Sequence, residues 1–119
     1  MMSIETKLIE WLSSRLAVPV SADVPEVRPP SFVTVERTGG DTVRAYGGAL
    51  VQDNPEMAIQ CWAHTRAEAE SLACAVDDLL PTFAYEPHIG RVARNSLYNF
   101  PDETGHVGRY QLVVDITTN

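Results

Sequence analysis

The sequence predicts an α+β fold: a mostly antiparallel sheet of four to five strands, two helices packed on one face of it, and a long loop between two adjacent strands. Two segments repeat apolar residues at helical spacing, and several others alternate apolar and polar residues as strands do. Their order along the chain, a helix followed by strands on both sides of a second helix, suggests this arrangement. With 119 residues, 45% of them hydrophobic, the chain is expected to form a single domain over 1–119.

The first helix is expected at about 3–16. Ser3 is a suitable N-cap, and Ile4, Leu8 and Leu12 recur at the spacing of an amphipathic helix. The prolines between 19 and 30 disfavour long regular structure there, so that only a short edge strand over 18–24 fits.

Two strands are expected next, at 31–37 and 56–62. The first places Val33 and Val35 on one face, and the second alternates Met57, Ile59 and Cys61 with other residues. The two can pair as a hairpin.

The segment between them, 38–54, is expected to be a long loop. It contains Gly39-Gly40 and Gly47-Gly48, and its few apolar residues keep no sustained period. Loops of this length in compact domains tend to be functional or disordered.

The second helix is the best marked element. Thr65 and Glu68 form a capping box, an apolar face follows, and Pro81 is expected to end the helix. After a connection over 81–88, strands are expected at 90–97 and 107–117, separated by turn residues over 99–108. The apolar face consists of Ala69, Leu72, Ala73, Val76, Leu79 and Leu80.

The residues that could do chemistry form no recognisable site. Cys61, His64 and Cys74 match no common zinc spacing, and both cysteines lie on apolar stripes, where we expect buried thiols and not nucleophiles. We therefore expect no catalytic residue, no metal and no cofactor.

The carboxylates and glycines form no recognisable catalytic or phosphate-binding site either. The acids Asp53, Asp77-Asp78 and Asp102-Glu103 fall near a helix end or in loops, where solvated acids are ordinary. The Gly-Gly pairs lack the spacing of a phosphate-binding loop. An enzyme that uses His64 or His88 with an acid would need one of these groups to be buried with a shifted pKa.

Charge and hydropathy argue against two classes of protein. Nine Lys and Arg against sixteen Asp and Glu give a net charge of -7, which argues against a protein whose main role is to bind phosphate backbones. No apolar run approaches the roughly 18 residues of a membrane span, and charged residues interrupt 1–17 where a signal peptide would be apolar. We expect a cytoplasmic product without a membrane partner.

The 38–54 segment and its flank carry the residues most suited to a protein interface, because Arg and Tyr are enriched at the energetic centres of such interfaces. The alternative is a solvated loop with a snorkelling arginine. The candidate interface residues are Arg37, Asp41, Arg44, Tyr46 and Leu50.

Three passages, taken in order, resemble the tail terminator (tail completion) proteins of long-tailed bacteriophages and prophages. They are VPEVRPPSFVTVERTGG, MAIQCWAHTRAEAESLACAVDDLL and DETGHVGRYQLVVDITT, and with the first helix they cover nearly the whole chain. The resemblance implies an α+β fold that assembles as a hexameric ring on the tail tube, stops tube polymerisation and offers a surface to the head connector.

The resemblance also implies a place and partners: a virion protein at the head-tail joint, assembled in the bacterial host cytoplasm, with a homo-oligomer, a tail tube protein and a connector protein as neighbours. It implies no enzyme activity, and it places the 38–54 segment near subunit or tube contacts. An acidic ring would let DNA pass without binding it. The alternative is a dimeric small-molecule-binding or regulatory module, in which the sheet face and the 38–54 segment enclose a ligand.

Overall fold

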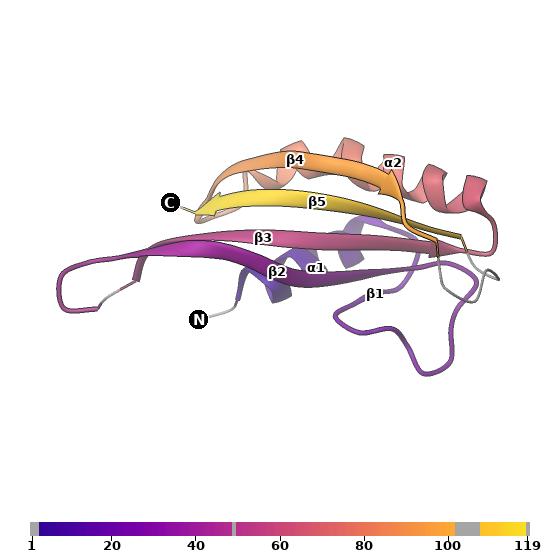
Figure 1. Cartoon of the computed structure of the whole chain (residues 1–119), viewed down its shortest axis with the longest axis horizontal. Coiled ribbons are helices and arrows are strands. Elements are labelled where there is room, and N and C mark those ends of the chain that lie inside the picture. Colours follow the sequence, from indigo (N-terminus) through magenta and orange to yellow (C-terminus); the bar gives the residue numbers. More distant parts are fainter. Residues whose placement is uncertain (1–2, 49, 102–107, 119) are drawn as a thin grey trace.

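The computed structural model describes residues 3–48, 50–101 and 108–118. Within them, five strands form one sheet in the order β1-β2-β3-β5-β4, and two helices accompany it (Figure 1). Every strand pair is antiparallel except β1 with β2. The predicted α+β fold with a mostly antiparallel sheet is confirmed. The elements are α1 (Ile4–Arg15), β1 (Val20–Ser21), β2 (Phe32–Arg44), β3 (Leu50–Ala63), α2 (Arg66–Phe83), β4 (Ile89–Asn99) and β5 (Gly108–Thr118).

The first helix begins where its cap predicts. The Ser3 hydroxyl accepts a hydrogen bond from the backbone N–H of Thr6 at 3.1 Å, which satisfies one of the unpaired amides of the first turn. Leu8 and Leu12 are completely buried. The Trp11 ring packs on that of Phe83 with 5.0 Å between centroids, which joins α1 to the end of α2.

The second helix begins at its predicted cap, where Thr65 accepts from the Glu68 N–H at 3.2 Å, but it does not end at Pro81 as predicted. It runs through Pro81 to Phe83. Proline inside a helix removes one backbone hydrogen bond and crowds the carbonyl four residues earlier, which disfavours a further turn. Here the further turn buries Phe83 completely and packs its ring 5.0 Å from that of Trp11, so a tertiary contact overrides the local preference.

One hydrophobic cluster joins the helices to alternate positions of the strands. The alternation predicted for the strands is confirmed, because Val33, Val35, Met57, Ile59 and Leu112 all belong to this cluster together with residues of α1 and α2. We call the sheet face that carries these residues the core face, and the opposite one the outer face. Their register also agrees with a hairpin, since Val35 pairs with Ile59.

The edge strand expected over 18–24 is reduced to Val20–Ser21. It runs parallel to β2 and pairs only with Val33 and Thr34, because proline-rich sequence surrounds it. The residues 102–107 of the expected turn lie outside the described part of the chain. Among the described helices, none combines the length and the hydropathy needed to cross a membrane.

The long loop expected over 38–54 is wrong. β2 continues to Arg44 and β3 starts at Leu50, so most of this segment is paired strand, and Asp41 lies opposite Asn54. The backbone ladder between two neighbouring antiparallel strands does not need apolar alternation, and the side chains described over 38–42 and 44–48 are exposed, so no core demands one there. The missing period therefore marked exposed side chains and not the absence of a strand.

Candidate functional site: a projecting arm of β2 and β3

The β2–β3 hairpin extends beyond the other strands of the sheet as a two-stranded projection (Figure 1). β3 pairs with β5 only from Glu56 to Ala63, so the residues nearer the turn have just each other as strand partners. We call residues 40–48 and 50–52 the arm. The described chain measures 50 × 25 × 24 Å, with the arm along the longest axis in Figure 1.

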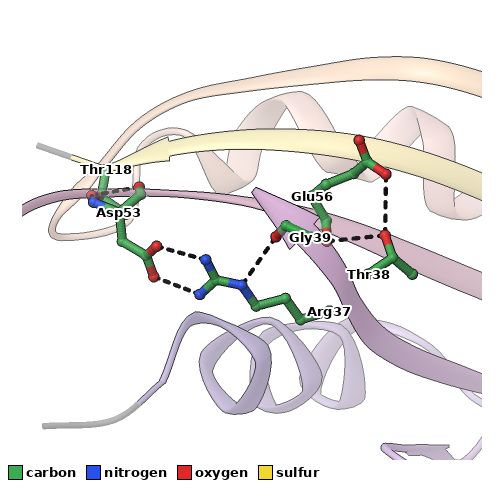
Figure 2. A network of polar contacts seen from close by, with 6 residues as sticks. All are labelled: Arg37, Thr38, Gly39, Asp53, Glu56 and Thr118. Carbon is green, nitrogen blue, oxygen red and sulfur yellow. Dashed lines mark hydrogen bonds and ion pairs between the residues drawn. The ribbon is translucent and has the colours of Figure 1, made fainter. Parts of the chain in front are cut away.

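An ion pair at the base fixes the two strands of the arm to each other. Both terminal nitrogens of Arg37 donate to the two carboxylate oxygens of Asp53 at 2.8 Å, and its Nε donates to the Gly39 carbonyl at 3.1 Å (Figure 2). The hydrogen bond to Asp53 raises the pKa of Arg37, so the guanidinium keeps its charge. A bidentate pair with both partners partly shielded holds its geometry better than a simple surface pair.

The end of β5 attaches the same point to the sheet. The Thr118 hydroxyl accepts from the Asp53 N–H at 2.7 Å and donates to the Asp53 carbonyl at 2.8 Å (Figure 2). The Gln52 side-chain amide donates to the Thr118 carbonyl at 3.0 Å. The last residue of β5 in the described chain therefore supports the arm where the strand ladder with β5 has ended.

One glycine, Gly40, allows the strands to approach closely at the base. Thr38 is an extra residue that interrupts the register between Arg37 and Gly39, and its hydroxyl contacts Glu56 (Figure 2). Gly40 has a φ of +102°, and a Cβ at this position would lie 2.1 Å from the Asn54 carbonyl oxygen. Only glycine fits there, whereas at Gly39 a Cβ would meet nothing within 4 Å.

The tip of the arm presents an aromatic side chain to solvent. Gly47 and Gly48 have φ values of +100° and +94° and close the turn, with the Gly48 N–H donating to the Ala45 carbonyl at 2.9 Å. The Arg44 guanidinium donates to the Gly48 carbonyl at 3.0 Å. Tyr46 is fully exposed at this turn. A tyrosine held out on a braced turn is suited to insertion into a partner.

The structure thus separates the candidate interface residues into two roles. Arg37 lies at the base and is committed to Asp53, so we assign it to positioning the arm. Asp41, Arg44 and Tyr46 are exposed along the arm. Leu50 begins β3, and its side chain lies outside the described part of the chain.

A cluster on the outer face was missed by the sequence reasoning. Phe32 and Trp62 are register partners whose rings stack with 5.3 Å between centroids, and the guanidinium groups of Arg28 and Arg109 lie 5.1 and 4.6 Å from the Trp62 ring centre. Arg109 also lies 4.3 Å from the Phe100 ring centre. Both Phe32 and Trp62 fall on strand positions that alternate away from the core face, and this was the available signal.

The candidates for catalysis and metal binding differ in burial. Cys61 is buried, as predicted, and burial raises the pKa of its thiol to about 12, whereas Cys74 is exposed, so the prediction of a buried thiol there is wrong. Cys74 falls just outside the stripe of α2 that Ala73 and Val76 bury. His64 and His88 are exposed. In the part of the chain that is described, no three His, Cys, Asp or Glu side chains are placed to hold a metal ion.

A shallow groove of about 270 Å³ lies along α1. Its lining is mostly charged and polar, with Lys7, Glu10, Arg15 and Glu86 around Trp11. The ligand-binding alternative placed its pocket between the sheet face and the 38–54 segment. That segment instead runs outward as the arm.

A comparison with models of known protein families found no match for this chain, and a comparison with curated proteins found none.

Proposed function

We propose that the chain is the subunit of a ring that caps a phage tail tube, as tail terminators do. In this proposal six copies form a ring in the virion, which stops polymerisation of the tube and provides the joint to the head connector. The chain acts by contact and needs no catalytic residue or cofactor. DNA passes through the ring without specific binding, which the net charge of -7 favours.

The observation that carries the proposal is the arm. A two-stranded ribbon without a sheet on either side is marginally stable in water, yet here it is braced at its base by Arg37, Asp53 and Thr118. A ring subunit that must reach a neighbour or the tube needs such a stiff projection, because ordering a flexible loop on docking costs free energy. Tyr46 at the tip supplies the contact.

The test measures mass and tube length together. Sedimentation across a wide concentration range, with and without a tail tube protein sought in the same gene neighbourhood, reports whether the chain forms hexamers. Electron microscopy reports whether the tubes stop growing. We expect hexamers, alone or on the tube, and short capped tubes.

A variant with a shortened arm tests whether the arm is needed for assembly but not for folding. Replacing residues 44–51 by Asn-Gly, a two-residue hairpin turn, leaves Arg37 and Asp53 in place. We expect this variant to unfold at nearly the same temperature and to lose ring formation or tube capping. The matched control is Tyr85→Ser, which removes an equally exposed tyrosine outside the arm. A chain that stays monomeric or dimeric with the tube protein and leaves tube length unchanged would overturn the proposal.

A further inference from the structure

Two long strand edges carry no strand partner within the described part of the chain. β4 is the last strand of the sheet order, and its strand partner in the described chain is β5, on one side. At the other end, β1 covers only Val33 and Thr34, so β2 has an open edge from Val35 to Arg44. Neither stretch contains proline or lysine, the residues that most often protect an edge from pairing with another chain.

The two open edges fit each other in direction and level. Because each neighbouring pair from β2 through β3 and β5 to β4 is antiparallel, β2 and β4 run in opposite directions. Following the register across the sheet places Val35 level with Leu97 and Gly39 level with Ala93. A second copy that continues the sheet would therefore meet β4 with an antiparallel β2 at matching height.

Between these two levels, the irregularities of the two edges match; the other irregularity of β4, between Ile89 and Arg91, lies beyond them. Thr38 is an extra residue in β2 and Asn95 is an extra residue in β4, and both lie between these two levels. Val35 to Gly39 and Ala93 to Leu97 are consequently stretches of equal length, so direct pairing between them leaves no residue over. A bulge normally disturbs pairing at an edge, but two bulges that compensate each other preserve it.

Charge is complementary in the same register. Two residues beyond Gly39 and Ala93, the pairing places Asp41 opposite Arg91, and both are exposed. Both side chains belong to the outer face. Asn54 lies three residues from the core residue Met57 in β3 and therefore faces the other side of the sheet, and its register partner Asp41 does the same. Arg91 directly precedes Val92, which packs on the core, so Arg91 also faces outward. An opposite charge pair directly across two strands is stabilising.

The remaining arginines do not oppose this pairing. Direct pairing puts Arg37 opposite Asn95 and Arg94 opposite Thr38, so the two guanidinium groups are not register partners. Each also has its own carboxylate, with Arg37 2.8 Å from Asp53 and Arg94 2.9 Å from Asp77. β4 contains two arginines and no acid in a chain of net charge -7, which makes it a suitable partner for another part of the same protein.

We propose that the β4 edge of one subunit pairs antiparallel with the β2 edge of a second copy, with Val35 opposite Leu97 and Asp41 opposite Arg91. The inference rests on the proposed ring and names its contact surface. Two different edges of each subunit take part, so the contact is heterologous, and repeating it closes a ring when the rotation per subunit allows. It also gives each arm a strand partner along the β2 side.

Disulfide cross-linking tests this register. Glu36 and Ser96 would be direct partners, at the Cα separation that a disulfide tolerates. The background is Cys74→Ser, which removes the exposed thiol, while Cys61 stays buried and protonated. The variant Glu36→Cys with Ser96→Cys is expected to give a ladder of covalent oligomers on oxidation. Each single variant alone should stay uncross-linked, and a mixture of the two should give dimers only.

The outcomes distinguish this inference from the proposed function. Hexamers in sedimentation without any cross-linked ladder, in a double variant that melts like its background, would overturn the edge pairing and leave the ring proposal standing. Dimers formed by Ser96→Cys alone would show β4 pairing with itself and would also overturn it. A chain that neither cross-links nor assembles with the tube protein would overturn both.

A charge exchange gives an independent measurement. Asp41→Arg and Arg91→Asp should each weaken association about three-fold or more per contact, because each puts like charges opposite one another. The variant with both changes restores an opposite pair and should recover the association of the parent chain. If the double variant is as weak as the two losses multiplied together, the two residues are not partners and the register is wrong.

Discussion

The two adjacent glycines at the base of the arm allow a closely matched test of how the arm is held. Gly40→Ala places a Cβ 2.1 Å from the Asn54 carbonyl oxygen and within 2.8 Å of two further backbone atoms, whereas Gly39→Ala meets nothing within 4 Å. Gly40 also has a φ of +102°, and adopting a left-handed conformation costs a residue with a side chain about 1–2 kcal/mol. The opposing atoms belong to the backbone, so no side-chain rotation relieves the contact.

The expected size follows from these two contributions. Separating the strands enough to admit the methyl group breaks at least one ladder hydrogen bond, worth about 1 kcal/mol, so we expect a total of about 2–3 kcal/mol. Because the arm has no other strand partner, this loss should appear as local opening of the arm. At 1.4 kcal/mol for each factor of ten, amide exchange in the arm should be faster by about 30- to 150-fold.

Hydrogen exchange with mass spectrometry on peptides that cover the arm is the assay. The effect of alanine on the unfolded chain is common to both variants, so Gly39→Ala is the control. The melting temperature should fall by no more than about 10 °C, since the arm opens before the core does. Arm exchange in Gly40→Ala within three-fold of Gly39→Ala would refute the close approach of the strands described for this position.

Three further predictions concern the base of the arm, the cysteines and the core. Asp53→Asn should lower the stability of the arm by about 1 kcal/mol, because it weakens the bidentate pair with Arg37. Asp41→Asn should leave the stability of the isolated chain unchanged. Hydrogen exchange of the arm peptides checks both variants. At pH 8 maleimide should label the folded chain once, at Cys74, and the unfolded chain twice, because burial raises the pKa of Cys61 to about 12. Mass spectrometry counts the labels. Two labels on the folded chain would contradict the burial of Cys61. Val76→Asp should unfold the chain, because it buries an unpaired charge. The control is Cys74→Asp, which places the same charge at an exposed position of the same helix. Circular dichroism that shows a native-like Val76→Asp variant would refute the helix packing.

The sequence sufficed for elements that a core defines. Alternation at Val33 and Val35 and the helical repeat at Leu8 and Leu12 arise because one face of each element is buried, and burial imposes a period. The caps at Ser3 and Thr65 depend only on residues three positions away, so the sequence predicted them equally well.

The errors share a physical cause, which is that the deciding interaction lies far away in sequence. The arm lacks a period because solvent surrounds it, and its strands are fixed by Arg37 with Asp53 and by Thr118, pairs that no local pattern reveals. The end of α2 depends on Phe83 meeting Trp11 across the molecule. Among the candidate interface residues, the sequence could not separate Arg37, which lies at the base and pairs with Asp53, from Tyr46 at the tip.

The stiffness of the arm bears on why a ring subunit would have one. If residues 40–48 and 50–52 were in a loop, ordering them on assembly would cost about 1 kcal/mol for each residue, which is comparable to the free energy of a whole modest interface. Pairing them in the free subunit removes most of that cost before any contact is made. The same pairing leaves the other edge of β2 accessible beyond Thr34, so the feature that makes the arm rigid also prepares it for a strand of the neighbouring subunit.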